Sequence, residues 1–312
     1  MKRTLLVVCF AMLATRAYAM NPYAQDWLVV HTEEERCADA RLAPDAQIDQ
    51  CIGALHGEIR TALRSVLVAD LGIAYARAGR FNLAMDYLTQ VLIADPGDWR
   101  VLQARGSIYL HLKRYNEALA DAESVLRLKP DAAYARILRG RAHALQGDLD
   151  AALSDANAAI ALRPDGAEGY FVRAIVYDDM EKYSLAIADW DKTIALHPAP
   201  ELYNDRCFDR ARLNSDLAAA FTDCAKALEP GPVAKYLDSR GFVYFRLGDY
   251  KAAIADYDAA LGKKPNYASS LFMRGIVKRK SGDAAGGDAD IVAAKAIDAK
   301  VAATYAKFGV TP

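Results

Sequence analysis

Apolar residues recur in this chain with a period of 34 residues. The segments that begin at Leu71, Arg105 and Arg139 align without a gap, and the same columns continue towards the C-terminus. Each period holds two stretches of helical spacing separated by a polar break. Seven units are predicted, at 65–98, 99–132, 133–166, 167–200, 201–233, 234–267 and 268–299. A fixed period of this length is typical of stacked two-helix units.

Each unit is predicted to be an antiparallel helical hairpin. In the unit 234–267, Gly248 marks the turn, while Gly241 and Ala253 occupy columns of small residues. Small side chains there allow the two helix backbones to approach closely. Pro265 lacks the amide hydrogen that a continuing helix needs, so the chain turns into the next unit.

The fifth unit, 201–233, departs from this pattern. It is one residue short, Phe208 stands where a small residue is expected, and Ala211 stands where an aromatic residue is expected. Its packing is therefore predicted to be the least regular.

The segment 20–64 is predicted to form a helical hairpin that covers the N-terminal end of the array. Thr32 followed by Glu35 is typical of a capping box. Pro44 opens a second helix that is expected to run to about His56.

The segment 300–312 is predicted to be a capping helix for the other end. Val301, Tyr305 and Phe308 are spaced by four and three residues, which places them on one face of a helix. Stacked arrays require such polar-backed caps at both ends.

Composition places the chain among globular proteins and weighs against nucleic acid as a partner. Of 312 residues, 53% are hydrophobic and 25% are charged, so the chain can bury a core. The 39 basic and 40 acidic residues leave a net charge of -1, which gives no global field to attract a polyphosphate.

Residues 1–19 are predicted to be a secretory signal peptide. A start with Lys2 and Arg3, an apolar run from Leu5 to Leu13 and a small-residue site ending at Ala19 fit that pattern. No stretch approaches the roughly 18 apolar residues of a membrane helix, so no transmembrane segment is expected. A periplasmic or secreted location follows.

Four cysteines remain after residue 19, and two disulfides are predicted from them. Cys37 and Cys51 lie symmetrically about Pro44, and Cys207 and Cys224 straddle a predicted turn. Residues equidistant from a hairpin turn face each other, and an exported protein meets an oxidising compartment. Four buried thiols are the alternative. A metal site is disfavoured, since no Cys-x-x-Cys occurs and the five histidines are scattered.

The sequence lacks the motifs that carry chemistry. A nucleophile elbow, a zinc-binding His-Glu-x-x-His, a phosphate loop and a dinucleotide fingerprint are all missing. Asp178 and Asp179 are adjacent, but neighbouring residues on a helix diverge by about 100°, so a catalytic carboxylate pair is disfavoured. The chain is expected to be neither an enzyme nor a cofactor-binding protein.

The columns resemble those of the tetratricopeptide repeat. The family pattern of small, aromatic, glycine, aromatic, alanine and proline positions is met by Gly72, Tyr75, Gly79, Phe81, Ala84 and Pro96. The resemblance implies an all-α, right-handed α-solenoid of about seven repeats. It also implies that the first helix of each repeat lines a concave groove that binds another protein or a peptide segment.

Carried onto this chain, the resemblance assigns a partner-binding groove. Its residues would be Ile137, Arg141, Phe171, Ile175, Asp178, Asp179, Asp205, Asp209, Asp238, Phe242, Phe245, Arg246, Phe272, Ile276 and Arg279. Outward-facing Phe and Ile rimmed by charge are typical of a protein-binding surface. The five acids are expected either to meet basic residues of a partner or to be solvated or paired with Arg206 and Arg212.

These features predict a non-catalytic scaffold or adaptor in the cell envelope, present as a monomer or a weak homo-oligomer. The alternative is an accessory protein that binds a cell-wall glycan or another non-protein envelope ligand. A self-assembling structural array is the third hypothesis.

Overall fold

The computed structural model describes residue 37 and residues 42–56 and 61–312. The predicted signal peptide and the predicted capping box at Thr32 lie outside these residues. Every helix or strand element among the described residues is an α-helix, which confirms the all-α fold class. The chain divides into two compact units, the first ending at Pro164 and the second running from Asp165 to Pro312.

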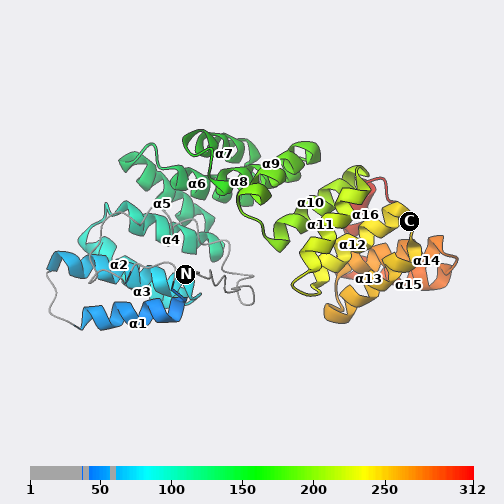
Figure 1. The fold of residues 1–312 in the computed structure, drawn as a ribbon, viewed down its shortest axis with the longest axis horizontal. Coiled ribbons are helices and arrows are strands. Elements are labelled where there is room, and N and C mark those ends of the chain that lie inside the picture. Colours follow the sequence, from blue (N-terminus) through cyan, green and yellow to red (C-terminus); the bar gives the residue numbers. More distant parts are fainter. Residues whose placement is uncertain (1–36, 38–41, 57–60) are drawn as a thin grey trace, which may run out of the picture. The chain divides into compact units, whose positions relative to one another are not determined.

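The first unit contains α1 to α7 and the second contains α8 to α16 (Figure 1). The helices of the first unit are α1 (Pro44–Leu55), α2 (Thr61–Arg77), α3 (Phe81–Ala94), α4 (Trp99–His111), α5 (Tyr115–Leu128), α6 (Ala133–Gln146) and α7 (Leu149–Leu162). Those of the second are α8 (Ala167–Asp179), α9 (Tyr183–Leu196), α10 (Pro200–Leu213), α11 (Leu217–Leu228), α12 (Ala234–Leu247), α13 (Tyr250–Lys263), α14 (Ala268–Lys280), α15 (Ala284–Ile297) and α16 (Val301–Ala306).

From α2 to α15 the helices form consecutive hairpins. Within each unit, each helix packs mainly against the helices before and after it in the sequence. The turn between α12 and α13 shows why the sequence folds this way. Gly248 adopts φ 79°, a left-handed conformation that glycine accepts without strain, and the Asp249 side chain accepts a hydrogen bond from the amide of Ala252 at 3.0 Å.

The small-residue columns lie where helix backbones meet. A Cβ atom added to Gly241 would lie 2.9 Å from Cε1 of Tyr257. One added to Gly275 would lie 2.7 Å from the carbonyl oxygen of Gly287. The close approach that the sequence predicted for these columns is therefore confirmed.

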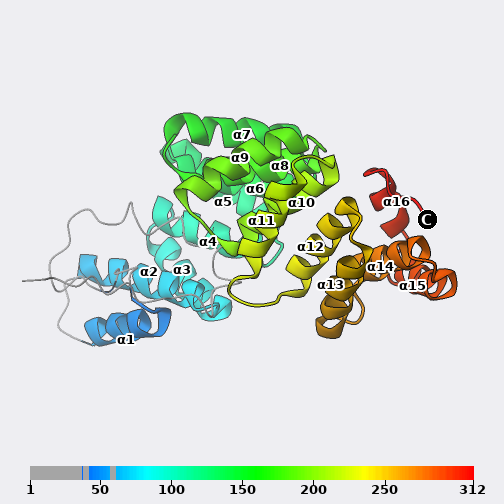
Figure 2. The same cartoon turned by 45° about the vertical axis from the view of Figure 1, so that its right-hand side comes forward.

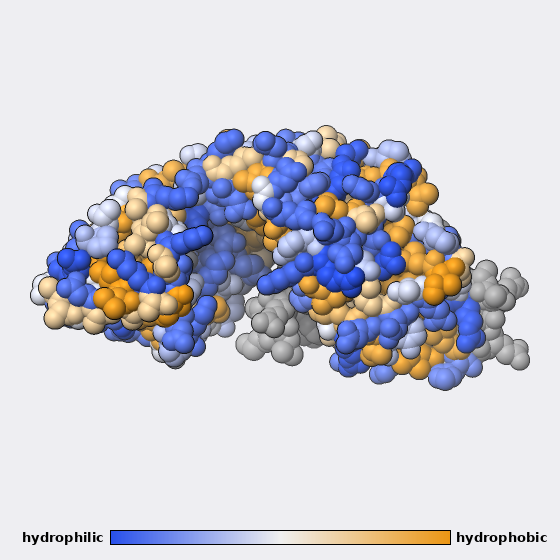
Figure 3. Space-filling model, turned by 180° about the vertical axis from the view of Figure 1, so that it is seen from behind, coloured by the Kyte–Doolittle hydropathy of each residue, from blue (hydrophilic) through white to orange (hydrophobic). Residues whose placement is uncertain are grey.

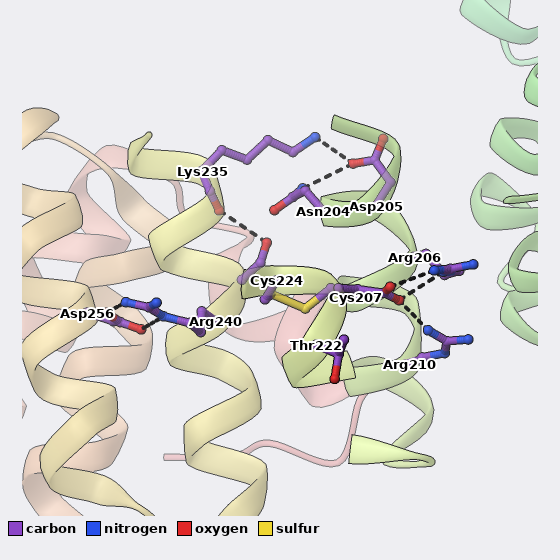
Figure 4. The surroundings of a disulfide bond; sticks show 12 residues. Asn204, Asp205, Arg206, Cys207, Arg210, Thr222, Cys224, Lys235, Arg240 and Asp256 are labelled. Atoms are coloured by element: carbon purple, nitrogen blue, oxygen red, sulfur yellow. Dashed lines mark hydrogen bonds and ion pairs between the residues drawn. A yellow bond between two sulfur atoms is a disulfide. The ribbon is translucent and has the colours of Figure 1, made fainter. Parts of the chain in front are cut away.

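Six of the seven hairpins share an ion pair that the sequence analysis did not anticipate. An arginine of the first helix donates two hydrogen bonds to an aspartate of the second helix, and the N···O distances are 2.6–2.9 Å. The pairs are Arg105–Asp121, Arg139–Asp155, Arg173–Asp189, Arg206–Asp223, Arg240–Asp256 and Arg274–Asp290 (Figure 4 shows two of them). The first hairpin has Leu71 and Tyr87 in these columns instead.

This ion pair fixes the register of the irregular fifth hairpin. Arg206 and Asp223 are 17 residues apart, whereas the partners in the other five pairs are 16 apart. The first helix therefore lies one residue earlier than the predicted unit 201–233, and α10 begins at Pro200. The extra residue is accommodated in the turn, where Asn214 and Asp216 both adopt positive φ.

The N-terminal helix α1 packs against α2. It begins at Pro44 and ends just before His56, as predicted. The side chain of Gln47 donates to the carbonyl oxygen of Cys37 at 2.8 Å, and Asp45 forms an ion pair with Arg80 at 2.7 Å. These contacts, together with the bond from Cys37 to Cys51, attach Cys37 to α1 and α1 to the first hairpin.

Candidate functional site

A row of mostly aromatic side chains lies along the second unit, mainly on the first helices of its hairpins, and we call it the aromatic groove. It consists of Tyr183 at the start of α9, Phe208 of α10, Phe242 of α12, and Phe272 and Ile276 of α14. Phe208 and Phe242 are neighbours, with ring centroids 5.7 Å apart. The corrected register explains this row, because Phe208 then takes the same place in its helix as Phe242 and Ile276 take in theirs.

The chain's own C-terminal segment, residues 301–310, lies in this groove. Figures 1 and 2 both show α16 beside α12 and α14. The ring of Tyr305 lies 5.7 Å from that of Phe242 and 5.5 Å from that of Phe272, and Tyr305 is buried. The aromatic groove is therefore filled by a short helical segment of the same molecule.

Phe308 extends these contacts towards the earlier helices of the unit. Its ring lies 6.4 Å from Phe208, 6.4 Å from Phe242 and 6.1 Å from Tyr183, in an arrangement that aromatic rings favour. The guanidinium of Arg212 lies 5.1 Å from the same ring, within the range of a cation–π contact. Phe308 therefore occupies a box with three aromatic walls and one cationic wall.

Two polar contacts hold the segment in place. Arg246 donates from Nη2 to the carbonyl oxygen of Phe308 at 2.5 Å. Nζ of Lys307 lies 2.5 Å from Oε1 of Glu181, across 126 residues of sequence. The ion pair is half exposed and therefore contributes little stability, but it fixes the direction of the segment.

This arrangement corrects the expected exposure of the groove. Phe242 and Phe272 are 0% exposed and Ile276 is 2% exposed, whereas the sequence analysis expected them to face outward. The expectation was wrong because the capping segment does more than cover the last hairpin. It is helical only from Val301 to Ala306, and its second half reaches back over α12 and α10.

Two of the five predicted groove acids are buried and cannot serve as a surface charge. Asp209 is 2% exposed and accepts a hydrogen bond from Nε1 of Trp190 at 2.9 Å. In the corrected register Asp209 falls in a column of buried apolar residues that includes Val243 and Val277. Burial, and then the neighbouring Asp178, raise the pKa of Asp209.

Asp238 is also buried, between α12 and α14. Its carboxylate accepts hydrogen bonds from Ser270 at 2.5 Å and from Ser269 at 3.1 Å. Burial raises the pKa of Asp238 to about 6, although the serine hydrogen bonds and the charge of Lys264 act in the opposite direction. Asp238 also affects Tyr305 of the C-terminal segment. Burial of the Tyr305 hydroxyl, and then the charge of Asp238, raise the pKa of that hydroxyl.

The other three acids lie at the surface, and two of them are paired within the chain. Asp178 pairs with Arg212, and Asp205 pairs with Lys235 at 2.7 Å. Asp179 is exposed. Arg206, expected as a partner for the groove acids, pairs instead with Asp223 and Asp191.

The remaining predicted residues are spread over both units. Phe171, Ile175 and Phe245 are half-buried on α8 and α12, and Arg279 is exposed at the end of α14. In the first unit, Ile137 is buried and Arg141 is half-buried on α6. Of the predicted groove residues, Phe242, Arg246 and Phe272 of α12 and α14 contact the C-terminal segment.

Sequence reasoning missed Tyr183 and Phe208 as members of one site. The signal that could have found Phe208 was the arginine column, because Arg206 aligns with Arg240 only if α10 is read one residue earlier.

Both predicted disulfides are present. The Cα atoms of Cys207 and Cys224 lie 5.5 Å apart, and those of Cys37 and Cys51 lie 4.7 Å apart. Cys207 falls in the small-residue column of Gly241, where two helices approach closely, so a bond to the facing helix fits there. Figure 4 shows the bond between Cys207 and Cys224, with Arg206 and Arg210 nearby.

Neither a metal cluster nor a membrane-spanning helix is found in the part of the chain that the structure describes. Its side chains contain no group of three or more His, Cys, Asp or Glu placed to hold an ion. None of its helices combines the length and the apolar character needed to cross a bilayer. On the face drawn in Figure 3, apolar residues form small clusters separated by polar ones.

Comparisons with known proteins agree with this geometry. Residues 69–131, 114–167 and 234–267 match the sequence profile of the tetratricopeptide repeat. A crystal structure of a tetratricopeptide repeat protein from Parabacteroides merdae covers 75% of this chain at a TM-score of 0.55 and 19% identity, over 92% of its own length. The fold is that of a tetratricopeptide repeat array. The Cut9-Hcn1 structure of the APC/C is also similar, with a TM-score of 0.66 and 18% identity over 87% of this chain and 54% of its own.

Two curated relatives match this chain over a short segment. The Hsp70-Hsp90 organizing protein of Triticum aestivum is 35% identical over 77 residues, which is 25% of this chain and 13% of the relative. The SGT1 homolog of Bos taurus is 36% identical over 72 residues, 23% of this chain and 21% of the relative. The matches thus span about a fifth or less of these proteins. Tetratricopeptide repeats generally mediate protein–protein interactions.

Proposed function

We propose that this protein is a non-catalytic adaptor that acts outside the cytoplasm and binds a segment of a partner protein in the aromatic groove. The observation that carries the proposal is the C-terminal segment itself. A short helical segment with two aromatic side chains already sits in the groove, so the surface has the shape and chemistry to hold one. Interfaces of this kind derive most of their binding free energy from a few buried aromatic anchors.

Two observations support an extracytoplasmic location. The structure contains two disulfides, which form and persist in oxidising compartments. Residues 1–19 also have the charged start, apolar run and small-residue site of a secretory signal peptide.

Binding of a cell-wall glycan has less support from the described residues. Sugar-binding sites present exposed aromatic faces, but Trp190 is buried and donates its indole hydrogen to Asp209. The aromatic rings of the groove contact one another and the C-terminal segment, which suits apolar side chains better than a hydroxylated sugar.

Site-specific photocrosslinking tests the proposal. A benzophenone amino acid replaces Phe245, which is half-buried beside Phe242, and in a matched control it replaces Ile93, which is exposed on α3 of the first unit. We expect Phe245 alone to capture one protein through one mapped segment, and that purified segment to bind the purified chain. Capture of the same proteins from both positions, or of none from Phe245, would contradict the proposal.

A further inference from the structure

We propose that residues 301–310 are an exchangeable occupant of the aromatic groove, and that a partner displaces them with a helical segment of matching chemistry. The matching segment carries two aromatic residues three positions apart, with a basic residue just before the second. This inference rests on the proposed function, because it specifies the ligand of the same groove. It also makes the free chain self-inhibited.

The contacts of the C-terminal segment are those of a bound peptide. Tyr305 and Phe308 supply the ring contacts, on one face of the segment. Arg246 recognises the main-chain carbonyl of Phe308, a contact that any peptide in this position can make. Apolar anchors three residues apart on one face are typical of helix-in-groove binding.

Capping of the array does not explain the second half of the segment. Val301 is buried and α16 contacts α14 and α15, so the last hairpin is already covered there. Phe308 continues past this end to Phe208 and Tyr183, which belong to hairpins further back in the second unit. A cap needs only the contacts of α16 with the last hairpin, whereas a ligand of the groove also needs the contacts of Phe308 with the earlier hairpins.

The segment is also small enough to leave. Its helix has six residues and is joined to α15 by residues 298–300. Thr304, Ala306, Lys307 and Gly309 are exposed, so the segment lies at the surface with only one face covered. An intramolecular occupant of this kind lowers the apparent affinity of any competitor in proportion to the fraction of time that the groove is open.

Charge fixes the preferred competitor. Lys307 pairs with Glu181 at the groove edge, and Arg212 and Arg246 flank the Phe308 box. A competing segment with a basic residue in the place of Lys307 keeps the first contact. A segment with an acidic residue in the place of Lys307 is repelled by Glu181 and binds more weakly.

A labelled peptide with the sequence of residues 299–312 tests exchange on the full-length mature chain. Fluorescence anisotropy compares the wild-type chain with Phe308→Ala, which weakens the internal occupant, and with Thr304→Ala, an exposed control in the same segment. We expect the Phe308→Ala chain to bind the peptide at least tenfold more tightly than the wild type, and Thr304→Ala to match the wild type. Thermal unfolding checks that both variants remain folded.

The peptide itself supplies the second arm. A peptide with alanine in place of Tyr305 and Phe308 is expected to bind the Phe308→Ala chain at least tenfold more weakly. A peptide with glutamate in place of Lys307 is expected to bind it about two- to fivefold more weakly, because the contact with Glu181 is half exposed. Equal binding of the unmodified peptide to the wild-type and Phe308→Ala chains would overturn the proposal. Light scattering gives a further check. If the Phe308→Ala chain forms a dimer that excess peptide does not dissociate, a second copy of the chain occupies the groove and the proposal is overturned as well.

The two proposals fail in different ways. If the peptide exchanges with the C-terminal segment but no specific protein is crosslinked, the displacement proposal stands and the adaptor function is refuted. If a specific partner binds the wild-type and Phe308→Ala chains equally, the adaptor function stands and the displacement of residues 301–310 is refuted.

Discussion

At the scale of single residues, Asp209 shows how one substitution changes the local chemistry of a repeat. The equivalent positions of the neighbouring hairpins hold Val176 and Val243, both fully buried. A carboxylate in that position needs partners, and Trp190 and Arg212 provide them. The guanidinium that compensates Asp209 also lies over Phe208 and Phe308, so this buried acid helps to build the aromatic groove.

The close approach at Gly241 gives a first prediction. Gly241→Ala places a Cβ 2.9 Å from the buried ring of Tyr257, and we expect a loss of about 1–3 kcal/mol in the free energy of unfolding. Gly262→Ala is the matched control, because it also lies in a helix of this hairpin but has nothing within 4 Å of the added atom. It is expected to stabilise by about 0.5–1 kcal/mol. Chemical denaturation of both variants measures the difference, and equal effects would contradict the packing described.

The raised pKa of Asp238 gives a second prediction. Its folded-state pKa of about 6 exceeds the unfolded value, so the folded state binds more protons between about pH 4 and 6. The contribution of Asp238 to stability is therefore present at pH 4 and decreases as the pH rises through 6, by about 2–3 kcal/mol. Asp238→Asn cannot titrate and should lack this contribution.

Denaturation of the wild type and Asp238→Asn at pH 4.5 and pH 7.5 tests this sign. The wild type should lose stability relative to the variant as the pH rises, because other titrating groups contribute equally to both chains. A wild type that gains stability relative to Asp238→Asn over this range would show that the carboxylate is better stabilised when ionised.

At the scale of elements, the repeated Arg–Asp pair connects the two helices of six of the seven hairpins. The aspartates are nearly buried, whereas the arginines keep part of their surface in water. Hydrogen bonding to Asp256 raises the pKa of Arg240, as expected for a charge-assisted pair. The first hairpin shows that an apolar solution also exists, because Leu71 and Tyr87 replace the pair there and Tyr87 stacks on Tyr75 at 5.4 Å.

Removing one member of a pair should therefore cost more than removing both. Arg240→Leu leaves Asp256 without its partner, and we expect a loss of about 2–3 kcal/mol, less than for a fully buried pair because Arg240 is partly exposed. The double variant Arg240→Leu/Asp256→Tyr copies the first hairpin, and it should recover at least half of that loss. A double variant that is less stable than the single one would refute this account.

The sequence predicted the hairpins well because their signals are local. Helical periodicity, Gly248 at a turn and the close contact at Gly241 each depend on neighbouring residues or on one facing helix. The disulfides followed from the same symmetry. These signals could not reveal the register of α10. The helix begins one residue earlier than predicted, but one extra residue in the turn at Asn214 restores the alignment, so Ala220 still falls in its expected column.

At the scale of the whole molecule, the position of the C-terminal segment is the feature that the sequence predicts least well. Val301, Tyr305 and Phe308 have the spacing of an amphipathic helix, and that spacing is the same for a cap over the last hairpin and for a segment that returns along the groove. Only the tertiary contacts distinguish the two. They also explain why aromatic residues that the sequence placed on a binding surface are buried, because that surface is an internal interface in this structure.

The central claim is that the C-terminal segment occupies the groove, and a pair of spin labels tests it most directly. Lys182→Cys and Ala306→Cys place labels at two exposed positions beside the Glu181–Lys307 contact. The experiment uses a chain without residues 1–19, in which the four native cysteines are paired in disulfides. The structure predicts one short, well-defined distance between the labels in the wild-type background, with a broad population of longer distances appearing on Phe308→Ala. A broad distribution of long distances in the wild-type background would contradict the account.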